Sequence, residues 1–213
     1  LAQRAYVVFT DLFPTAGIRE RTARFGDRAS CRVLAVDSVC TVPSGAFAKA
    51  EYAARTIRPK LAALLSSSIE PVVDHPPRVA VTAIINSTVR ELLAAIPLDI
   101  GAMSDADIAQ VVAECEIDHA VAPVSTRGGS VAADTRWREF MRTALPMYAE
   151  RRNEGSDPDG TSGLSPYLHY GQISSAAMVR EVRAVGAPSE SVDAFVQQLT
   201  TWRELSYNWC VRP

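Results

Sequence analysis

Residues 161–174, TSGLSPYLHYGQIS, gather small hydroxyl side chains, a glycine, a proline and aromatic rings in one short stretch. Thr161, Ser162 and Ser165 offer hydroxyl groups, and Gly163 lets the backbone approach another group closely because it has no Cβ atom. Pro166 suits the first turn of a helix, where free N–H groups attract anions. The pattern favours a site for a phosphate-bearing ligand. An ordinary helix N-cap explains the same residue types, so both interpretations stay open.

A second group of residues falls on one face of the helix that we predict near the end of the chain. Gln198, Trp202, Leu205 and Trp209 follow one another at helical spacing. An amide and two indoles could hydrogen-bond and stack on a flat, polar ligand. Tryptophans at this spacing are also typical of a packed core, and spacing alone does not separate the two.

The hydroxyl-rich stretch resembles the FAD-binding segment of the photolyase and cryptochrome flavoproteins, in particular the class II cyclobutane pyrimidine dimer photolyases. Two further stretches resemble that family in the same order: KAEYAARTIRPKL at residues 49–61 and WRELSYNWC at 202–210. The resemblance covers most of the chain and is thin between about residues 72 and 122. It implies light-driven repair of pyrimidine dimers by electron transfer from reduced FAD, with UV-damaged DNA as the partner.

The resemblance also implies roles for individual residues. It assigns FAD contacts to Tyr148, Thr161, Ser162, Gly163, Leu164, Ser165 and Phe195. It assigns DNA contacts to Arg152, Gln198, Trp202 and Arg203, of which Gln198 and Trp202 would act on the dimer itself as the catalytic pair. Some members of the family also carry an antenna chromophore, whose identity this sequence does not indicate.

Gln198 departs from the family, which carries a glutamate at that position. An amide can donate and accept hydrogen bonds, but it has no negative charge and no transferable proton. We therefore expect Gln198 to lower the repair yield rather than the binding of a dimer. The change keeps two alternatives open: a cryptochrome-like photosensor without repair activity, and a non-catalytic truncated remnant.

Composition describes an ordinary globular protein. Of the 213 residues 47% are hydrophobic, and 22 Lys and Arg against 24 Asp and Glu give a net charge of -2. The sequence has no apolar run of membrane-spanning length and no metal-ligand spacing among its Cys and His residues, so we expect a cytoplasmic monomer without a bound metal. Contact with DNA would have to come from local basic groups, at residues 55–60 and 151–152, which also suit solvated helix faces.

The elements that must position these residues begin with an α/β segment. Strands are predicted at residues 6–10 and 31–36, with a helix at 15–25 that Gly26 ends, so the two strands should pair in parallel. We expect residues 1–65 to form the end of the parallel sheet of an α/β domain, and residues 66–127 an interdomain linker. Residues 128–213 would form the first part of an all-α FAD-binding domain.

Helices follow from the apolar periodicity. We predict a helix with Ile57, Leu61, Leu64 and Leu65 on one apolar face, which Pro59 kinks or starts and which ends at residues 66–68. Linker helices are predicted at 86–96 and 104–115, the second capped by Ser104 with Asp107. One helix should span 132–152 despite Pro146, another should bury Met178 and Val182 and reach Val185, and a last one, capped by Ser189 or Ser191, should run through Trp209. The family's remaining flavin contacts lie further along its members, so we expect the chain to be a fragment that binds FAD weakly or not at all.

Overall fold

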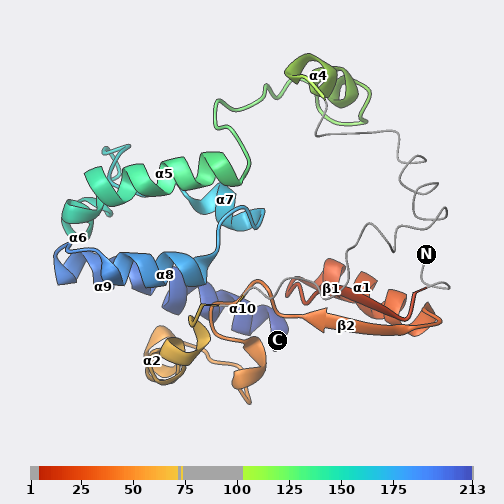
Figure 1. Ribbon diagram of the computed structural model, residues 1–213, viewed down its shortest axis with the longest axis horizontal. Helices are drawn as coiled ribbons and strands as arrows, with labels where there is room; N and C mark the ends of the chain where they lie inside the picture. The colour runs from red at the N-terminus through yellow and green to blue at the C-terminus, as the bar shows by residue number, and fades with distance from the viewer. Residues whose placement is uncertain (1–4, 72, 74–102, 213) are drawn as a thin grey trace. The chain divides into compact units, whose positions relative to one another are not determined.

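The computed structural model describes residues 5–71, 73 and 103–212 (Figure 1). The chain divides into two compact units, one made of Leu1–Pro71 and Gly128–Pro213 and the other of Val72–Arg127. Each unit is described by itself below. The helix expected at residues 86–96 lies outside the described residues.

The first unit opens with a β-α-β segment. Strand β1 (Val7–Asp11) and strand β2 (Arg32–Val36) pair in parallel, and helix α1 (Ala16–Arg28) connects them. This pairing confirms the predicted topology. Gly26 does not end the helix as expected: α1 runs on to Arg28, and the N–H of Ala29 still donates to the carbonyl of Phe25 at 2.9 Å.

The next helix packs one apolar face into the core. After a short 3₁₀ turn, η2 (Ser44–Ala46), helix α2 (Ala54–Ser68) buries Ile57, Leu61 and Leu65 and ends where the serine run predicts. The predicted helix end and most of its apolar face are therefore confirmed, whereas Leu64 is only half-buried and Pro59 lies inside the helix and does not start it.

The single helix expected at residues 132–152 is wrong. Helix α5 (Ser130–Thr143) ends before a 3₁₀ turn, η4 (Leu145–Met147), and a short helix, α6 (Tyr148–Arg151), follows. Pro146 lies in that turn. Because proline has no N–H and its ring clashes with the preceding turn, α5 cannot continue through it. The chain changes direction there, and α6 then packs against a later helix, α9 (Ser189–Gln197).

The C-terminal part of this unit is helical throughout. Helices α7 (Ser165–His169) and α8 (Ser175–Ala184) lead into α9, a π-helical turn, η5 (Gln198–Trp202), and α10 (Arg203–Val211). Met178 and Val182 of α8 are buried as predicted, whereas Val185 lies just past the helix end and is exposed. The predicted last helix does run through Trp209, because α9, η5 and α10 follow one another without a gap, and the π-helical turn η5 widens the helix between Gln198 and Trp202.

The predicted serine cap of α9 is also wrong. Pro188 occupies the cap position and makes no side-chain cap bond. Ser191 instead joins two elements: its Oγ accepts a hydrogen bond from the backbone N of Ala149 (3.1 Å) and donates one to the carbonyl of Pro146 (3.3 Å).

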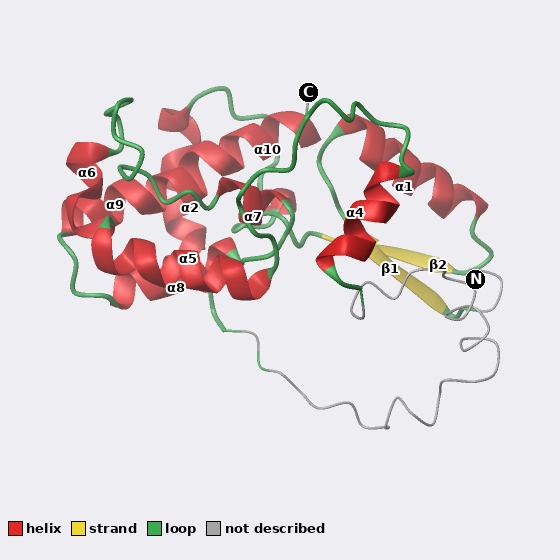
Figure 2. Ribbon diagram, turned by 90° about the horizontal axis from the view of Figure 1, so that it is seen from above, coloured by secondary structure: helices red, strands yellow, loops and turns green. Residues whose placement is uncertain are grey.

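An aromatic cluster forms the centre of the helical core, where α5 lies alongside α8 and α9 (Figures 1 and 2). The rings of Trp137, Phe140, Tyr148 and Phe195 have centroids 4.8 to 5.9 Å apart. The indole N of Trp137 donates to the carboxylate of Glu181 at 2.6 Å, which ties α5 to α8. These contacts fix the face of α5 that carries the candidate site.

The second unit contains helix α4 (Asp105–Ala113). Ser104 caps it, and the side chain of Asp107 bonds back to the N of Ser104, which confirms the predicted capping pair.

Candidate functional site

The hydroxyl segment forms an ordered turn before α7. Leu164 is fully buried and anchors it, whereas the side chains of Thr161 and Ser165 are exposed and that of Ser162 is half-buried. The N–H of Leu164 donates to Ser162 Oγ at 3.4 Å. Pro166 lies in the first turn of α7, as predicted. The turn therefore exposes the hydroxyl groups of Thr161 and Ser165 to solvent, while the buried side chain of Leu164 holds it against the core.

Gly163 has φ 65°, a left-handed backbone conformation that side chains rarely adopt. A Cβ atom at this position would lie 3.2 Å from Nε of Arg136 and 3.3 Å from its Nη2. Arg136 therefore covers the side of Gly163 that has no Cβ atom. We expected a ligand to approach the backbone there, but this side chain takes that place.

Two predicted FAD contacts, Tyr148 and Phe195, lie together in the aromatic core. Both are buried, and their rings meet edge to face with centroids 5.3 Å apart. Burial raises the pKa of Tyr148, and the positive charge of Arg152 partly opposes that rise. Their ring contacts are with each other, Phe140 and Trp137.

The residues predicted to meet the dimer lie on and beside the π-helical turn. Gln198 is half-buried, and the indoles of Trp202 and Trp209 are 48% and 59% exposed. These two tryptophans are not core residues, so the packed-core interpretation of their spacing is wrong. Arg152, at the end of α6, is half-buried.

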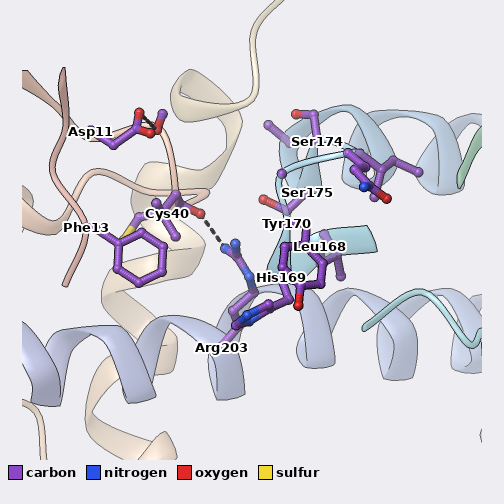
Figure 3. A pocket seen from close by; sticks show the side chains of 15 residues that line it. Asp11, Phe13, Cys40, Leu168, His169, Tyr170, Ser174, Ser175 and Arg203 are labelled. Atoms are coloured by element: carbon purple, nitrogen blue, oxygen red, sulfur yellow. Dashed lines mark hydrogen bonds between the residues drawn. The ribbon is translucent and has the colours of Figure 1, made fainter. Parts of the chain in front are cut away.

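A pocket of about 450 Å³ opens at the carboxyl ends of both strands (Figure 3). Its lining comes from the end of β1, the residues after β2, the α7–α8 connection and the start of α10. Ligands of open α/β sheets bind outside these strand ends. The second half of the hydroxyl-rich stretch, residues 168–174, lines this pocket together with Arg203, whereas Thr161, Ser165 and Trp202 do not line it.

Arg203 is held in place by this pocket wall. Its Nη1 donates to the carbonyl of Val39 at 2.6 Å (Figure 3). Its guanidinium also lies over the ring of Tyr207, 4.7 Å from the centroid. Across the mouth of the pocket, Ser38 Oγ donates to Asp11 Oδ1 at 2.6 Å and joins the two strand ends. Arg203 therefore has a structural contact in addition to any contact with DNA.

Glu204 is a buried carboxylate behind this wall, with 2% of its surface exposed. It accepts a hydrogen bond from the N of Thr41 (2.7 Å), and Arg203 Nη1 lies 3.5 Å away. Burial raises the pKa of Glu204 to about 7, and the contacts with Thr41 and Arg203 oppose only part of the rise. Burial also raises the pKa of the neighbouring Cys40 thiol, which the charges of Glu204 and Asp37 raise further. Cys40 is therefore a neutral thiol at physiological pH.

The predicted basic groups differ in availability. On α2, Arg55 and Arg58 are exposed, and Arg58 Nη2 donates to Gln197 at 3.3 Å, which places this helix beside the start of the π-helical turn. Lys60 pairs with the buried Glu51. Arg151 makes two hydrogen bonds to Asp157, at 2.6 and 2.8 Å, so its charge is already balanced.

Two absences concern only the described part of the chain. There, no three His, Cys, Asp or Glu side chains gather closely enough to hold a metal ion. Within those same residues, no helix combines the length and apolar character needed to cross a bilayer.

The structure thus groups most of the predicted residues in three places: the exposed turn, the aromatic core and the π-helical turn. Arg152 lies apart at the end of α6, and Arg203 lies in the pocket wall at the start of α10. Sequence reasoning missed Arg136 and Glu204. Nothing local predicts Arg136, because its partner lies 26 residues away. Glu204 had a detectable pattern, since Val196, Thr200, Glu204 and Asn208 recur every four residues and all are buried.

Comparison with known proteins gives the family. No family model matches the chain. Proteins named deoxyribodipyrimidine photo-lyase do match: that of Arabidopsis thaliana is 33% identical over 208 residues, and that of Oryza sativa subsp. japonica 31% over 226. These alignments cover 94% and 97% of this chain. One from Potorous tridactylus is 30% identical over 167 residues, which is 76% of this chain and 27% of the relative.

The chain is therefore a member of the deoxyribodipyrimidine photo-lyase family, and the resemblance of its motifs is confirmed. It spans about 40% of the length of the two plant relatives.

Proposed function

We propose that this chain is part of a light-driven DNA repair enzyme that splits cyclobutane pyrimidine dimers with the help of FAD. The observation that carries the proposal is the agreement between the relatives' name and three motifs in the same order, over 94% of the chain in the Arabidopsis match. The assignment to class II rests on the amino-acid sequence of residues 162–174, SGLSPYLHYGQIS.

The exposed turn fits the polar part of FAD in its chemistry. Thr161 and Ser165 present free-standing hydroxyl groups at the surface, and Leu164 holds the turn against the core. Hydroxyl groups next to the start of a helix are suited to phosphate and ribityl oxygens. FAD, when bound, would supply the electron that splits the dimer. The residues of this turn would hold and orient it, and Tyr148 and Phe195 would support them from the core.

The face around the π-helical turn fits a flat, uncharged base. Trp202 offers an exposed indole for stacking, and Gln198 an amide that can pair with a carbonyl or an N–H edge, which is how extruded bases are usually held. The exposed arginines of α2 lie beside this turn and could contact phosphates of the DNA backbone. Arg152 would add a further DNA contact.

The FAD step is tested by a double variant, Thr161→Val with Ser165→Ala, in the purified chain. FAD binding, measured by quenching of flavin fluorescence, should be weak in the wild type and about 30-fold weaker in the variant, because two hydrogen bonds of ~1 kcal/mol are lost. Ser156→Ala, an exposed serine on the neighbouring loop, is the matched control and should leave the affinity unchanged. Equal affinity in all three proteins would contradict the assignment of the turn.

The repair step is tested with the full-length gene product, reduced FAD and an oligonucleotide that carries one thymine dimer. Repair should require near-ultraviolet or blue light and should be absent in the dark. Gln198→Glu should raise the number of dimers split per photon without tightening dimer binding, since only the glutamate brings a charge. Unchanged repair in the glutamate variant would refute the role given to Gln198.

Gln198 favours one second candidate, a photosensor of the cryptochrome kind that keeps the cofactor but does not repair. The two functions separate in the same assay. A sensor would bind FAD and respond to light with no dimer splitting in either the wild type or the Gln198→Glu variant.

A further inference from the structure

Arg136 is the charged side chain that contacts the exposed turn most closely. It belongs to α5, whose neighbouring residues Ala133, Trp137 and Phe140 are buried, so its backbone position is fixed by the core. Its Nε donates to the carbonyl of Ser162 at 2.8 Å, and its Nη1 donates to Glu139 at 3.2 Å. The guanidinium therefore forms one hydrogen bond within α5, to Glu139, and one to the turn, at Ser162.

This hydrogen bond sets the direction of one peptide group. In a trans peptide the C=O and the following N–H point in opposite directions. Because the carbonyl of Ser162 points at Arg136, the N–H of Gly163 points away from α5. A Cβ at residue 163 would lie 3.2 Å from Nε and 3.6 Å from Cζ of this guanidinium, a tight contact that adds to the strain of φ 65° and that glycine avoids.

We propose that Arg136 is a positioning residue for the candidate FAD turn: it orients the peptide between Ser162 and Gly163 so that the backbone N–H and the exposed hydroxyls face the same ligand. This rests on the proposed function of the turn. Arg136 itself contacts no ligand in this role. Glycine at position 163 lets the guanidinium of Arg136 pack closely against this peptide.

The test compares Arg136→Met and Arg136→Lys with Arg138→Met in the purified chain. Arg138 lies two residues further along the same helix, is exposed and pairs with Asp134, so it is a matched control for loss of one α5 arginine. Amide hydrogen exchange at Leu164, whose N–H donates to Ser162 Oγ within the turn, should be at least about tenfold faster in Arg136→Met than in Arg138→Met. Exchange within α9 should be the same in both variants.

FAD provides the second readout, with the affinity measured as for the hydroxyl variants. Arg136→Met should weaken FAD binding about tenfold, and Arg136→Lys should recover part of the loss, because its ammonium can still donate to the carbonyl of Ser162. A merely structural role would slow or speed exchange throughout the core and would not be rescued by lysine. Unchanged exchange at Leu164 overturns the inference.

Failure of the inference and failure of the proposed function give different results. If the wild-type chain binds no FAD, the cofactor assignment fails, while the exchange rates still decide whether Arg136 orients the turn. If FAD binds the wild type and Arg136→Met equally well, the cofactor assignment stands and the positioning role is refuted. Should Arg136→Met not fold, the lysine variant carries both measurements.

Discussion

Glu204 is a buried residue whose ionisation should affect stability. Its carboxyl group lies behind the pocket wall, bonded to Thr41 and 3.5 Å from Arg203, yet its pKa is about 7, well above the ordinary 4.5, because burial outweighs both contacts. A raised pKa in the folded state means that folding favours the protonated form. The protonated Glu204 side chain therefore makes its full contribution to the free energy of unfolding below about pH 4.5, and this contribution is lost as the pH rises through 7.

We therefore expect the free energy of unfolding to fall between pH 5 and pH 8, by on the order of 3 kcal/mol from this residue. Glu204→Gln should remove that pH dependence, because an amide keeps the acceptor for Thr41 but does not ionise. Urea unfolding at the two pH values measures it. Glu190→Gln, an exposed glutamate of α9, is the control. A variant as pH-dependent as the wild type would contradict the assignment.

Gly160 is a second residue with a sharp requirement. A Cβ there would lie 2.7 Å from the carbonyl oxygen of Arg151, which is backbone and cannot swing aside. Gly160→Ala should cost about 1–3 kcal/mol of stability. Gly155 on the same loop has open space around it, so Gly155→Ala should change the melting temperature little. Similar losses in both variants would show that the contact is not rigid.

At the scale of the elements, Ser191 joins α9 to the 3₁₀ turn and α6. Ser191→Ala would leave the N–H of Ala149 without its hydrogen bond in a partly buried place, at a cost of about 1–2 kcal/mol. Ser189→Ala at the first residue of α9 should have almost no effect, since that serine is exposed and Pro188 holds the cap position. Chemical denaturation of both variants checks this. The opposite ranking would restore the serine cap that the sequence predicts.

The elements also show how far sequence reasoning reaches. The β-α-β pairing, the buried face of α2 and the Ser104 cap were predictable, because each depends on apolar periodicity or on residues a few positions apart. The break at Pro146 was also readable from the sequence, because it follows from the missing N–H and the ring of proline. The bridging role of Ser191 and the π-helical turn at Gln198–Trp202 were not, since each depends on packing between helices. In the site, the motif residues could be named from the resemblance. Arg136 could not, because only the fold brings it to Ser162.

At the scale of the first unit, residues 37–44 connect the strand ends to the helices. Thr41 Oγ1 shares a buried hydrogen bond with Ser175 Oγ at 2.8 Å, its N–H donates to Glu204, and Val39 accepts from Arg203. On the far side, Arg19 of α1 donates to the carbonyl of Val211 at 2.9 Å. These contacts join the β-α-β segment to α8 and α10, so we expect the unit to unfold as a whole.

Thr41→Val tests this cooperativity. It removes the hydroxyl while keeping the shape and the backbone N–H, and leaves Ser175 Oγ without its partner, at a cost of about 1–2 kcal/mol. The unfolding curves from far-ultraviolet circular dichroism and from tryptophan fluorescence should shift together to lower denaturant and still coincide. Ser38→Ala, which loses a more exposed bond to Asp11, is the milder control. Two separated transitions would show that strands and helices unfold independently.

The placement of the three indoles gives the protein built-in optical reporters. Trp137 is enclosed and bonded to Glu181, whereas Trp202 and Trp209 project from the last helical segments. A dissolved collisional quencher such as iodide should first quench the fluorescence of Trp202 and Trp209, and the remaining, blue-shifted emission should come from Trp137. Events at the outer surface and events in the core can therefore be followed separately in a single cuvette, with no dye attached.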